Sequence, residues 1–166
     1  MQDIKRQSDE ELMALIKSHQ SHFALTELHK RYSRKLLGYF IKMLNRDEHL
    51  AQDFVQELFL KIWEKSQLFQ EDKKFYTWLF TIASNMCKTH YRNHYRVVSE
   101  DMTRPVFDRN VFQENLTDKT HFEEALKLGI DSLELAHKTV FILRYLEQFP
   151  LQEIAEITET PVGTVK

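Results

Sequence analysis

A chain of 166 residues with one cysteine, Cys87, cannot form an internal disulfide, and three Gly with three Pro are too few for the turns of an all-β protein. No apolar run approaches the roughly 18 residues of a membrane span, and the N-terminus, MQDIKRQSDEEL, is too polar for a signal peptide. The formal net charge of −2 hides a basic and an acidic half, because residues 1–98 carry 16 Lys and Arg against 12 Asp and Glu while residues 99–166 carry 7 against 13.

These features predict a soluble, cytoplasmic, all-α protein, and local signals place its first helices. Ser8 and Glu11 form a capping box, which predicts a helix from Asp9 to about His19. Apolar side chains then recur on one helical face from about His22 to Leu44, which predicts a second, longer helix. A third helix is expected to begin near Asp47.

The third segment, DEHLAQDFVQELFLKIWEK, has two contrasting faces at 100° per residue. The apolar side chains that form the buried stripe are Phe54, Val55, Leu58, Phe59 and Ile62. The opposite face collects Asp53, Gln56, Glu57, Leu60 and Glu64. Leu60 is either a lone exposed leucine, which proteins tolerate, or the apolar anchor of a polar face that binds a basic protein.

A fourth helix is expected over FYTWLFTIASNMCKTHYRNHYR, residues 75–96, which holds six aromatic and three basic side chains and no carboxylate. The stripe expected to pack on the third helix is Trp78, Leu79, Ile82, Ala83 and Met86. Further aromatic residues and cations surround that stripe, and such a mixture suits single-stranded nucleic acid, since bases stack on rings and phosphates need charge. The alternative is that most of these rings are core residues and the cations a solvated edge.

Residues 97–118 contain Pro105, lack helical periodicity and carry five carboxylates against two Arg, so we expect an extended or disordered linker. Helices are then predicted over about 119–133, 137–147 and 151–158. Thr160 can cap a further helix and Pro161 suits its first position. The chain ends at Lys166, and an isolated helix needs about 12 residues, so we expect this last helix to be cut off.

Two motifs resemble a known family. AQDFVQELFLKIW followed by FYTWLFTIASN looks like conserved region two of bacterial sigma factors of the extracytoplasmic-function group, and LEQFPLQEIAEITETPVGTVK is similar to the start of their region four. The matching segments cover about two thirds of the chain in the family's order and spacing. Two motifs correctly placed are far more specific than either alone.

The resemblance implies a domain organisation and a function. It implies a four-helix promoter-melting domain over 1–96, an acidic linker over 97–118, and a helix-turn-helix domain over 119–166 with its recognition helix cut off. In the family the linker threads through polymerase channels, where negative charge could mimic nucleic acid; a solvated tether is the alternative. The implied function is a non-catalytic transcription initiation factor that binds core RNA polymerase and recognises and melts promoter DNA, without a cofactor or a metal.

The resemblance also implies site residues. The helix that resembles the family's contact with the polymerase clamp helices carries Asp53, Gln56, Glu57 and Leu60. The residues expected to contact promoter DNA, as the single-stranded non-template strand or as duplex, are Lys73, Lys74, Phe75, Tyr76, Trp78, Asn85, Lys88, Arg92, Arg96, Thr164 and Lys166. In the family the position of Asn85 contributes to a pocket for an extruded base. The resemblance further implies an anti-sigma factor as a partner and no direct membrane insertion of this chain.

Three positions depart from the family pattern. Many members carry Arg where this chain has Ser84 and Asp where it has Thr89, so promoter specificity cannot be transferred. The helix-turn-helix turn often has Gly where Glu159 stands, and that position favours a residue that tolerates φ > 0.

Two other functions stay open on the sequence alone. One is a stand-alone helix-turn-helix regulator of transcription, although a reader of duplex DNA alone has no need of stacking surfaces. The other is a helical metal enzyme, since Cys87, His90 and His94 share one helical face at a spacing compatible with zinc. Only three ligands are visible there, and the carboxylate pair Asp53 and Glu57 has no partner nucleophile.

Overall fold

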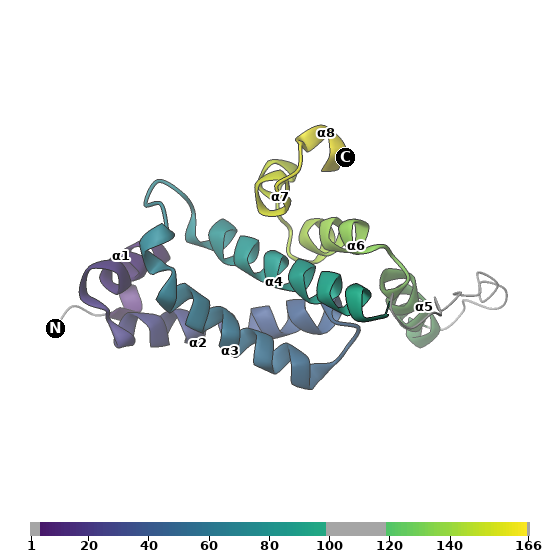
Figure 1. Ribbon diagram of the computed structural model, residues 1–166, viewed down its shortest axis with the longest axis horizontal. Helices are drawn as coiled ribbons and strands as arrows, with labels where there is room; N and C mark the ends of the chain where they lie inside the picture. Colours follow the sequence, from purple (N-terminus) through teal and green to yellow (C-terminus); the bar gives the residue numbers. More distant parts are fainter. Residues whose placement is uncertain (1–3, 99–118, 166) are drawn as a thin grey trace.

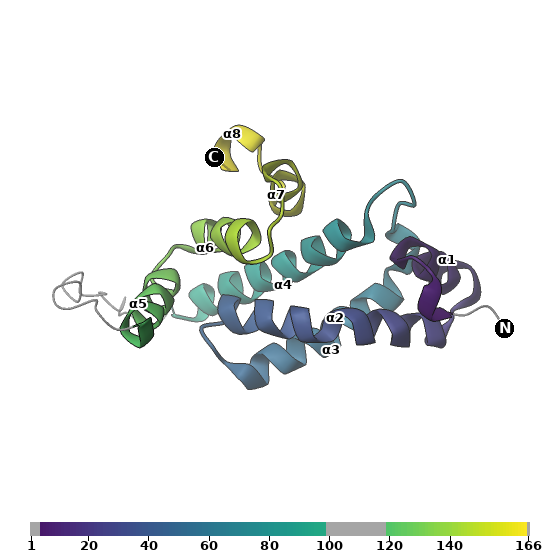
Figure 2. The ribbon, with the colours of Figure 1, turned by 180° about the vertical axis from the view of Figure 1, so that it is seen from behind.

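The computed structural model describes residues 4–98 and 119–165, and every regular element in these ranges is helical (Figures 1 and 2). The helices in chain order are α1 (Asp9–His19), α2 (His22–Met43), α3 (Glu48–Glu64), α4 (Phe75–Val98), α5 (Lys119–Asp131), α6 (Leu135–Phe141), α7 (Leu151–Thr158) and α8 (Val162–Val165). Short helical turns are η1 (Ile4–Arg6), η2 (Ser66–Leu68) and the π-helical η3 (Ile142–Leu146). The all-α prediction is confirmed for the described residues. None of their helices is both long and apolar enough to cross a membrane.

Local side-chain caps set the starts of the first three helices. The Ser8 hydroxyl accepts from the N–H of Glu11 at 3.2 Å, while the Glu11 carboxylate accepts from the N–H of Ser8 at 2.7 Å, so the predicted capping box is present. Ser21 and Asp47 cap α2 and α3 in the same way, each accepting from the N–H three residues on. Each cap contributes about 1 kcal/mol. The predicted starts of these helices are confirmed.

Aromatic side chains fill the centre of the bundle formed by α1 to α4. Tyr39 and Phe40 on α2 and Phe80 on α4 are fully buried, and the Tyr39 ring meets the other two edge-on at 5.6 and 5.2 Å. The buried Tyr39 hydroxyl lies 2.9 Å from the hydroxyl of Ser84. This hydrogen bond satisfies both groups and places Ser84 in the core.

The remaining helices differ slightly from the prediction. The helix expected over 119–133 ends at Asp131, and the one expected from 137 begins at Leu135 and continues through the π-helical η3 to Leu146. Glu134, in an extended conformation, separates the two. The prediction over 151–158 is confirmed by α7. Residues 99–118, most of the predicted linker, lie outside the described residues, and α4 runs through Val98, two residues into the segment assigned to that linker.

Glu159 ends α7 in the left-handed conformation, with φ 55° and ψ 38°. A side chain in this region costs about 1–2 kcal/mol, and glycine avoids that cost. We expect Glu159→Gly to stabilise the protein by up to about 1 kcal/mol, since the greater freedom of glycine in the unfolded chain offsets part of the gain. The measurement is the midpoint of urea unfolding. Glu156→Gly, inside α7, should lower the midpoint, and two changes of the same sign would contradict the argument.

The second group of helices packs directly on the first. In both views α6 and α7 lie on the same side of α4, and α7 lies near its N-terminal half (Figures 1 and 2). Phe149, which precedes α7, is 2% exposed because its ring stacks on Tyr76 at 4.8 Å and meets Phe80 at 5.1 Å. A second contact involves Lys138 on α6, whose buried ammonium donates to Asn45 at 2.9 Å. The two groups are therefore joined by side chains more than 60 residues apart in the sequence.

Candidate functional site

The exposed face of α3 carries the four residues expected to bind a protein partner. Asp53, Gln56, Glu57 and Leu60 are all exposed. The opposite face, Phe54, Val55, Leu58, Phe59 and Ile62, is buried as predicted. Leu60 keeps 62% of its surface exposed between polar neighbours. Among the described residues the structure thus presents an acidic face with an apolar side chain within it.

The aromatic residues at the start of α4 are less accessible than expected. Phe75 is fully buried against Tyr32, Phe69 and Trp78, so in this arrangement it offers no ring face to a base. The core alternative for this ring therefore has the support of the structure. Trp78 is partly buried against Phe69 at 5.2 Å.

Tyr76 is the ring at which the two groups of helices meet. It is half-buried, with Phe149 stacked on it and the ammonium of Lys35 at 4.8 Å from its centre. Burial raises the pKa of the Tyr76 hydroxyl, and the nearby Lys35 opposes that rise. The pKa of Glu147 is likewise raised by burial, although its carboxylate lies 3.7 Å from the Lys35 ammonium. These groups are partly desolvated by the contact between α2, α4 and the segment before α7.

The basic residues on α4 and in the turn before it fall into two sets. Lys73 and Arg92 are exposed, and no ion pair or hydrogen bond of their side chains is found within the described residues. Lys74 forms an ion pair with Glu153 on α7 at 2.6 Å, and the Lys88 ammonium donates to the Thr158 carbonyl at 3.4 Å. The helix and the turn before it thus have cations on their surface, and Lys74 and Lys88 already contact α7.

The remaining residues expected to bind DNA are Arg96, Thr164 and Lys166. The side chain of Arg96, on the last turns of α4, lies outside the described residues, as does Lys166. Thr164 is exposed on α8.

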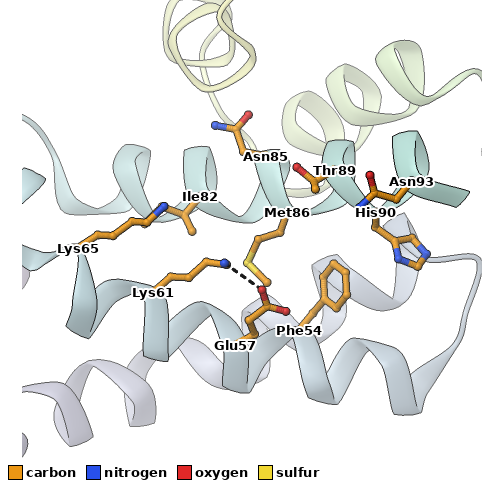
Figure 3. A pocket seen from close by; sticks show the side chains of 10 residues that line it. All are labelled: Phe54, Glu57, Lys61, Lys65, Ile82, Asn85, Met86, Thr89, His90 and Asn93. Carbon is orange, nitrogen blue, oxygen red and sulfur yellow. Dashed lines mark ion pairs between the residues drawn. The ribbon is translucent and has the colours of Figure 1, made fainter. Parts of the chain in front are cut away.

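A groove of about 420 Å³ runs between α3 and α4 (Figure 3). Its lining residues are Phe54, Glu57, Lys61, Lys65, Ile82, Asn85, Met86, Thr89, His90 and Asn93. Glu57 and Lys61 come from α3 and Lys65 directly follows this helix, at i, i+4 and i+8, and the Glu57 carboxylate pairs with the Lys61 ammonium at 3.0 Å. In Figure 3 the Met86 and Phe54 side chains lie between the helices, whereas Asn85 rises from the rim on the α4 side.

The α4 side of the groove repeats the spacing of the α3 side. Asn85, Thr89 and Asn93 follow one another at i, i+4 and i+8, so amide and hydroxyl side chains line this side of the groove. Sequence reasoning found Asn85 and missed Lys61, Lys65 and Asn93. Their equal spacing in the sequence was visible, but only the packing of α3 on α4 shows that both rows line one groove.

The metal hypothesis has no support in the described residues, where no group of three or more His, Cys, Asp or Glu side chains could hold a metal ion. Cys87 is buried, and desolvation raises the pKa of its thiol to about 12, which disfavours the thiolate that a metal needs. His90 and His94 stack on each other at 6.2 Å instead.

Comparison with known proteins identifies the family. The family described as Sigma-70 region 2 matches residues 28–97, and Sigma-70 region 4 matches residues 123–166. The ECF RNA polymerase sigma-E factor of Haemophilus influenzae is 30% identical over 153 residues, which cover 86% of this chain and 80% of that protein. The chain belongs to the ECF group of sigma factors. The region-two match includes α3, which carries the exposed acidic face, and nearly all of α4, which carries the basic face. The region-four match includes α7, which contacts α4.

Other relatives of this ECF sigma factor agree. SigW of Bacillus subtilis is 29% identical over 145 residues, covering 81% of this chain and 77% of SigW. Among solved structures, CnrH in complex with the cytosolic domain of CnrY superposes with a TM-score of 0.66 at 22% identity, over 95% of this chain and 86% of CnrH. The sigma factor RpoE of Bartonella quintana, in complex with the anti-sigma factor NepR, gives 0.63 at 21% identity, over 84% and 86% of the two chains. These two similarities show a shared fold.

Proposed function

We propose that this ECF sigma factor binds core RNA polymerase through the acidic face of α3 and recognises and melts promoter DNA with α4. The observation that carries the proposal is the exposed Leu60 among Asp53, Gln56 and Glu57, on a helix that lies inside the region-two match. A face of this kind, with an apolar anchor in a charged surround, suits a basic protein partner. The test is retention of the purified chain on immobilised core RNA polymerase. No retention above empty resin would contradict the proposal.

Melting of promoter DNA has a physical requirement that α4 can meet. Opening duplex DNA costs about 1.4 kcal/mol per base step in lost stacking, so a protein must offer the separated strand a better environment than water. Exposed cations such as Lys73 and Arg92 attract the phosphates, and the amide of Asn85 can form hydrogen bonds with the edge of an extruded base. Phe75 stays out of this interface because it is buried.

Arg92 is proposed to attract phosphates and Asn85 to contact a base, so their substitutions should have different effects. Arg92→Ala should weaken binding to single-stranded promoter oligonucleotides by a similar factor for every sequence. It should also reduce the slope of log affinity against log salt concentration by about one. Asn85→Ala should instead change the order of preference at one base, because one good amide contact discriminates by about 1–3 kcal/mol. The measurement is a titration of oligonucleotides that differ at single positions.

Asn93→Ala provides the matched control for Asn85→Ala. It removes the same amide two turns further along α4 and should leave the base preference unchanged. If Asn85→Ala reduced affinity equally for all four bases, Asn85 would be a general contact and the assignment to base recognition would be wrong.

The boundaries of the functional parts are also proposed. We assign polymerase binding and promoter melting to residues 1–96, a connecting role to 97–118, and binding of the upstream promoter element to the region-four-like part, 119–166, which includes Thr164 and Lys166. No catalytic step is assigned to any residue. A stand-alone helix-turn-helix regulator is disfavoured, because the region-two match covers the basic helix that such a protein would not need.

We also propose cytoplasmic action and an anti-sigma partner. RNA polymerase works in the cytoplasm, and the similar chains CnrH and RpoE were each solved with a bound protein, which for RpoE is an anti-sigma factor. Co-purification of this chain with a small protein that blocks its retention on polymerase would support such a partner.

A further inference from the structure

The residues next to the start of α4 do not supply a helix cap. α4 begins at Phe75, its first turn holds no carboxylate, and Lys73 and Lys74 precede it. A lysine side chain cannot accept a hydrogen bond from a backbone N–H, and a cation at the positive end of a helix is unfavourable. By contrast, α1, α2 and α3 each begin after a serine or an aspartate that caps them. The local sequence therefore does not fix where α4 starts.

A carboxylate from α1 supplies the missing cap. The Glu10 side chain accepts from the backbone N–H of Phe75 at 3.0 Å, across 65 positions of sequence. It thereby satisfies one of the N–H groups that have no acceptor inside a helix, and it places a negative charge at the positive end of α4. The N–H of Trp78 donates to the Lys74 carbonyl at 3.2 Å, which closes the first turn behind this cap.

Glu10 is itself held in place by its neighbours. The carboxylate of Asp9 accepts from the Arg31 guanidinium at 2.8 Å and from the Tyr32 hydroxyl, so the first turn of α1 is tied to α2. On the other side, Glu11 belongs to the capping box of α1. Because the backbone at Glu10 is fixed by these contacts, only its side chain loses freedom when it caps α4.

The same face of α1 also holds the segment that leads into α4. Lys17 lies about two turns after Glu10, and its ammonium donates to the Phe69 carbonyl at 3.1 Å. The side-chain amide of Gln67 donates to the Lys17 carbonyl at 2.8 Å. α1 therefore fixes this segment at both ends, where it leaves η2 and where it enters α4.

We propose that Glu10 is a positioning residue for promoter recognition, because its cap orders the turn at which the DNA-binding face of α4 begins. The inference rests on the proposed function of α4. Three of the residues expected to contact DNA, Lys73, Lys74 and Trp78, lie on this turn or directly before it. An ordered turn holds these groups in one arrangement before DNA arrives, so the binding of DNA does not have to order them.

Charge alone predicts the opposite effect of removing Glu10. Its carboxylate lies near the two lysines that precede α4, so a purely electrostatic role would make its removal strengthen the binding of phosphates. Positioning predicts weaker binding, since the loss of an N-cap shifts the balance between an ordered and a frayed first turn about fivefold. The sign of the change in DNA affinity therefore separates the two roles.

Three variants of the full chain test the proposal by titration with a short mixed-sequence single-stranded DNA at low salt. Glu10→Ala should lower the affinity by about two- to fivefold. Glu10→Gln keeps an acceptor oxygen without the charge and should restore most of that loss. Asp72→Ala is the matched control, because it removes a carboxylate beside Lys73 whose side chain has no hydrogen bond or ion pair within the described residues. It should leave the affinity equal or higher.

Two further measurements accompany the titration. Retention on core polymerase should be the same for all three variants, because the exposed face of α3 is unchanged. The Phe75 amide should exchange its hydrogen about fivefold faster in Glu10→Ala than in the unaltered chain, since it loses its acceptor.

Equal or tighter DNA binding by Glu10→Ala would overturn the positioning role, as would an unchanged exchange rate at Phe75. The same weakening by Asp72→Ala would overturn it too, because loss of charge would then account for the effect. Failure of every chain to bind DNA, the unaltered chain included, would instead refute the proposed function of α4. The exchange rate would then still decide whether Glu10 fixes the start of that helix.

Discussion

Leu60→Glu is expected to lower the affinity of the chain for core RNA polymerase by about one to two orders of magnitude. An apolar anchor in a protein interface commonly contributes 2 kcal/mol or more, and each 1.4 kcal/mol is a factor of ten. The new carboxylate also requires desolvation at the centre of the contact. The fold should be unaffected, because the side chain is 62% exposed and substitutions at such sites change stability by about 0.5 kcal/mol or less.

Leu68→Glu is the matched control for this experiment. Leu68 is 68% exposed and lies in η2, outside the α3 face, so the same change of size and charge occurs away from the proposed contact. Retention on polymerase should fall for Leu60→Glu and persist for Leu68→Glu. Equal retention of the two variants on polymerase would show that Leu60 does not contribute to polymerase binding.

The parts of this structure that depend on near neighbours could be predicted from the sequence. The Ser8 capping box and the two faces of α3 involve residues three or four apart, and both are found as expected. The same periodicity left open whether the rings at the start of α4 are core or surface. Phe75 and Tyr76 are adjacent, yet one is in the core and the other meets Phe149, more than 70 residues away. No local pattern carries that information.

The candidate site shows the same limit. Asn85 was found through the resemblance, but the groove beside it depends on how α3 approaches α4, and its lysines were missed for that reason. Lys138 is a sharper case. A lysine in a short helix would be assigned to the surface, and it is buried because Asn45, after α2, and Asp131, on α5, supply its hydrogen bonds.

Phe80→Ala is expected to destabilise the protein by about 3–5 kcal/mol, a large part of the roughly 5–15 kcal/mol by which domains of this size are stable. The Phe80 ring is fully buried between Tyr39, Tyr76 and Phe149, so its loss leaves a cavity where α2, α4 and the segment before α7 meet. The measurement is urea unfolding followed by tryptophan fluorescence, since Trp63 and Trp78 both report on the α1–α4 bundle.

Phe23→Ala removes the same ring from a position that is 74% exposed and should change stability by about 0.5 kcal/mol or less. Comparing the stability of Phe80→Ala and Phe23→Ala separates the effect of burying the ring from the effect of the residue type. Because Phe80 packs against Tyr76 while Phe149, just before α7, stacks on it, Phe80→Ala should also weaken the contact between the two groups of helices, and the unfolding transition should broaden or split. A cost below about 1 kcal/mol would mean that the bundle closes around the missing ring, and the aromatic centre would then not be what positions α4.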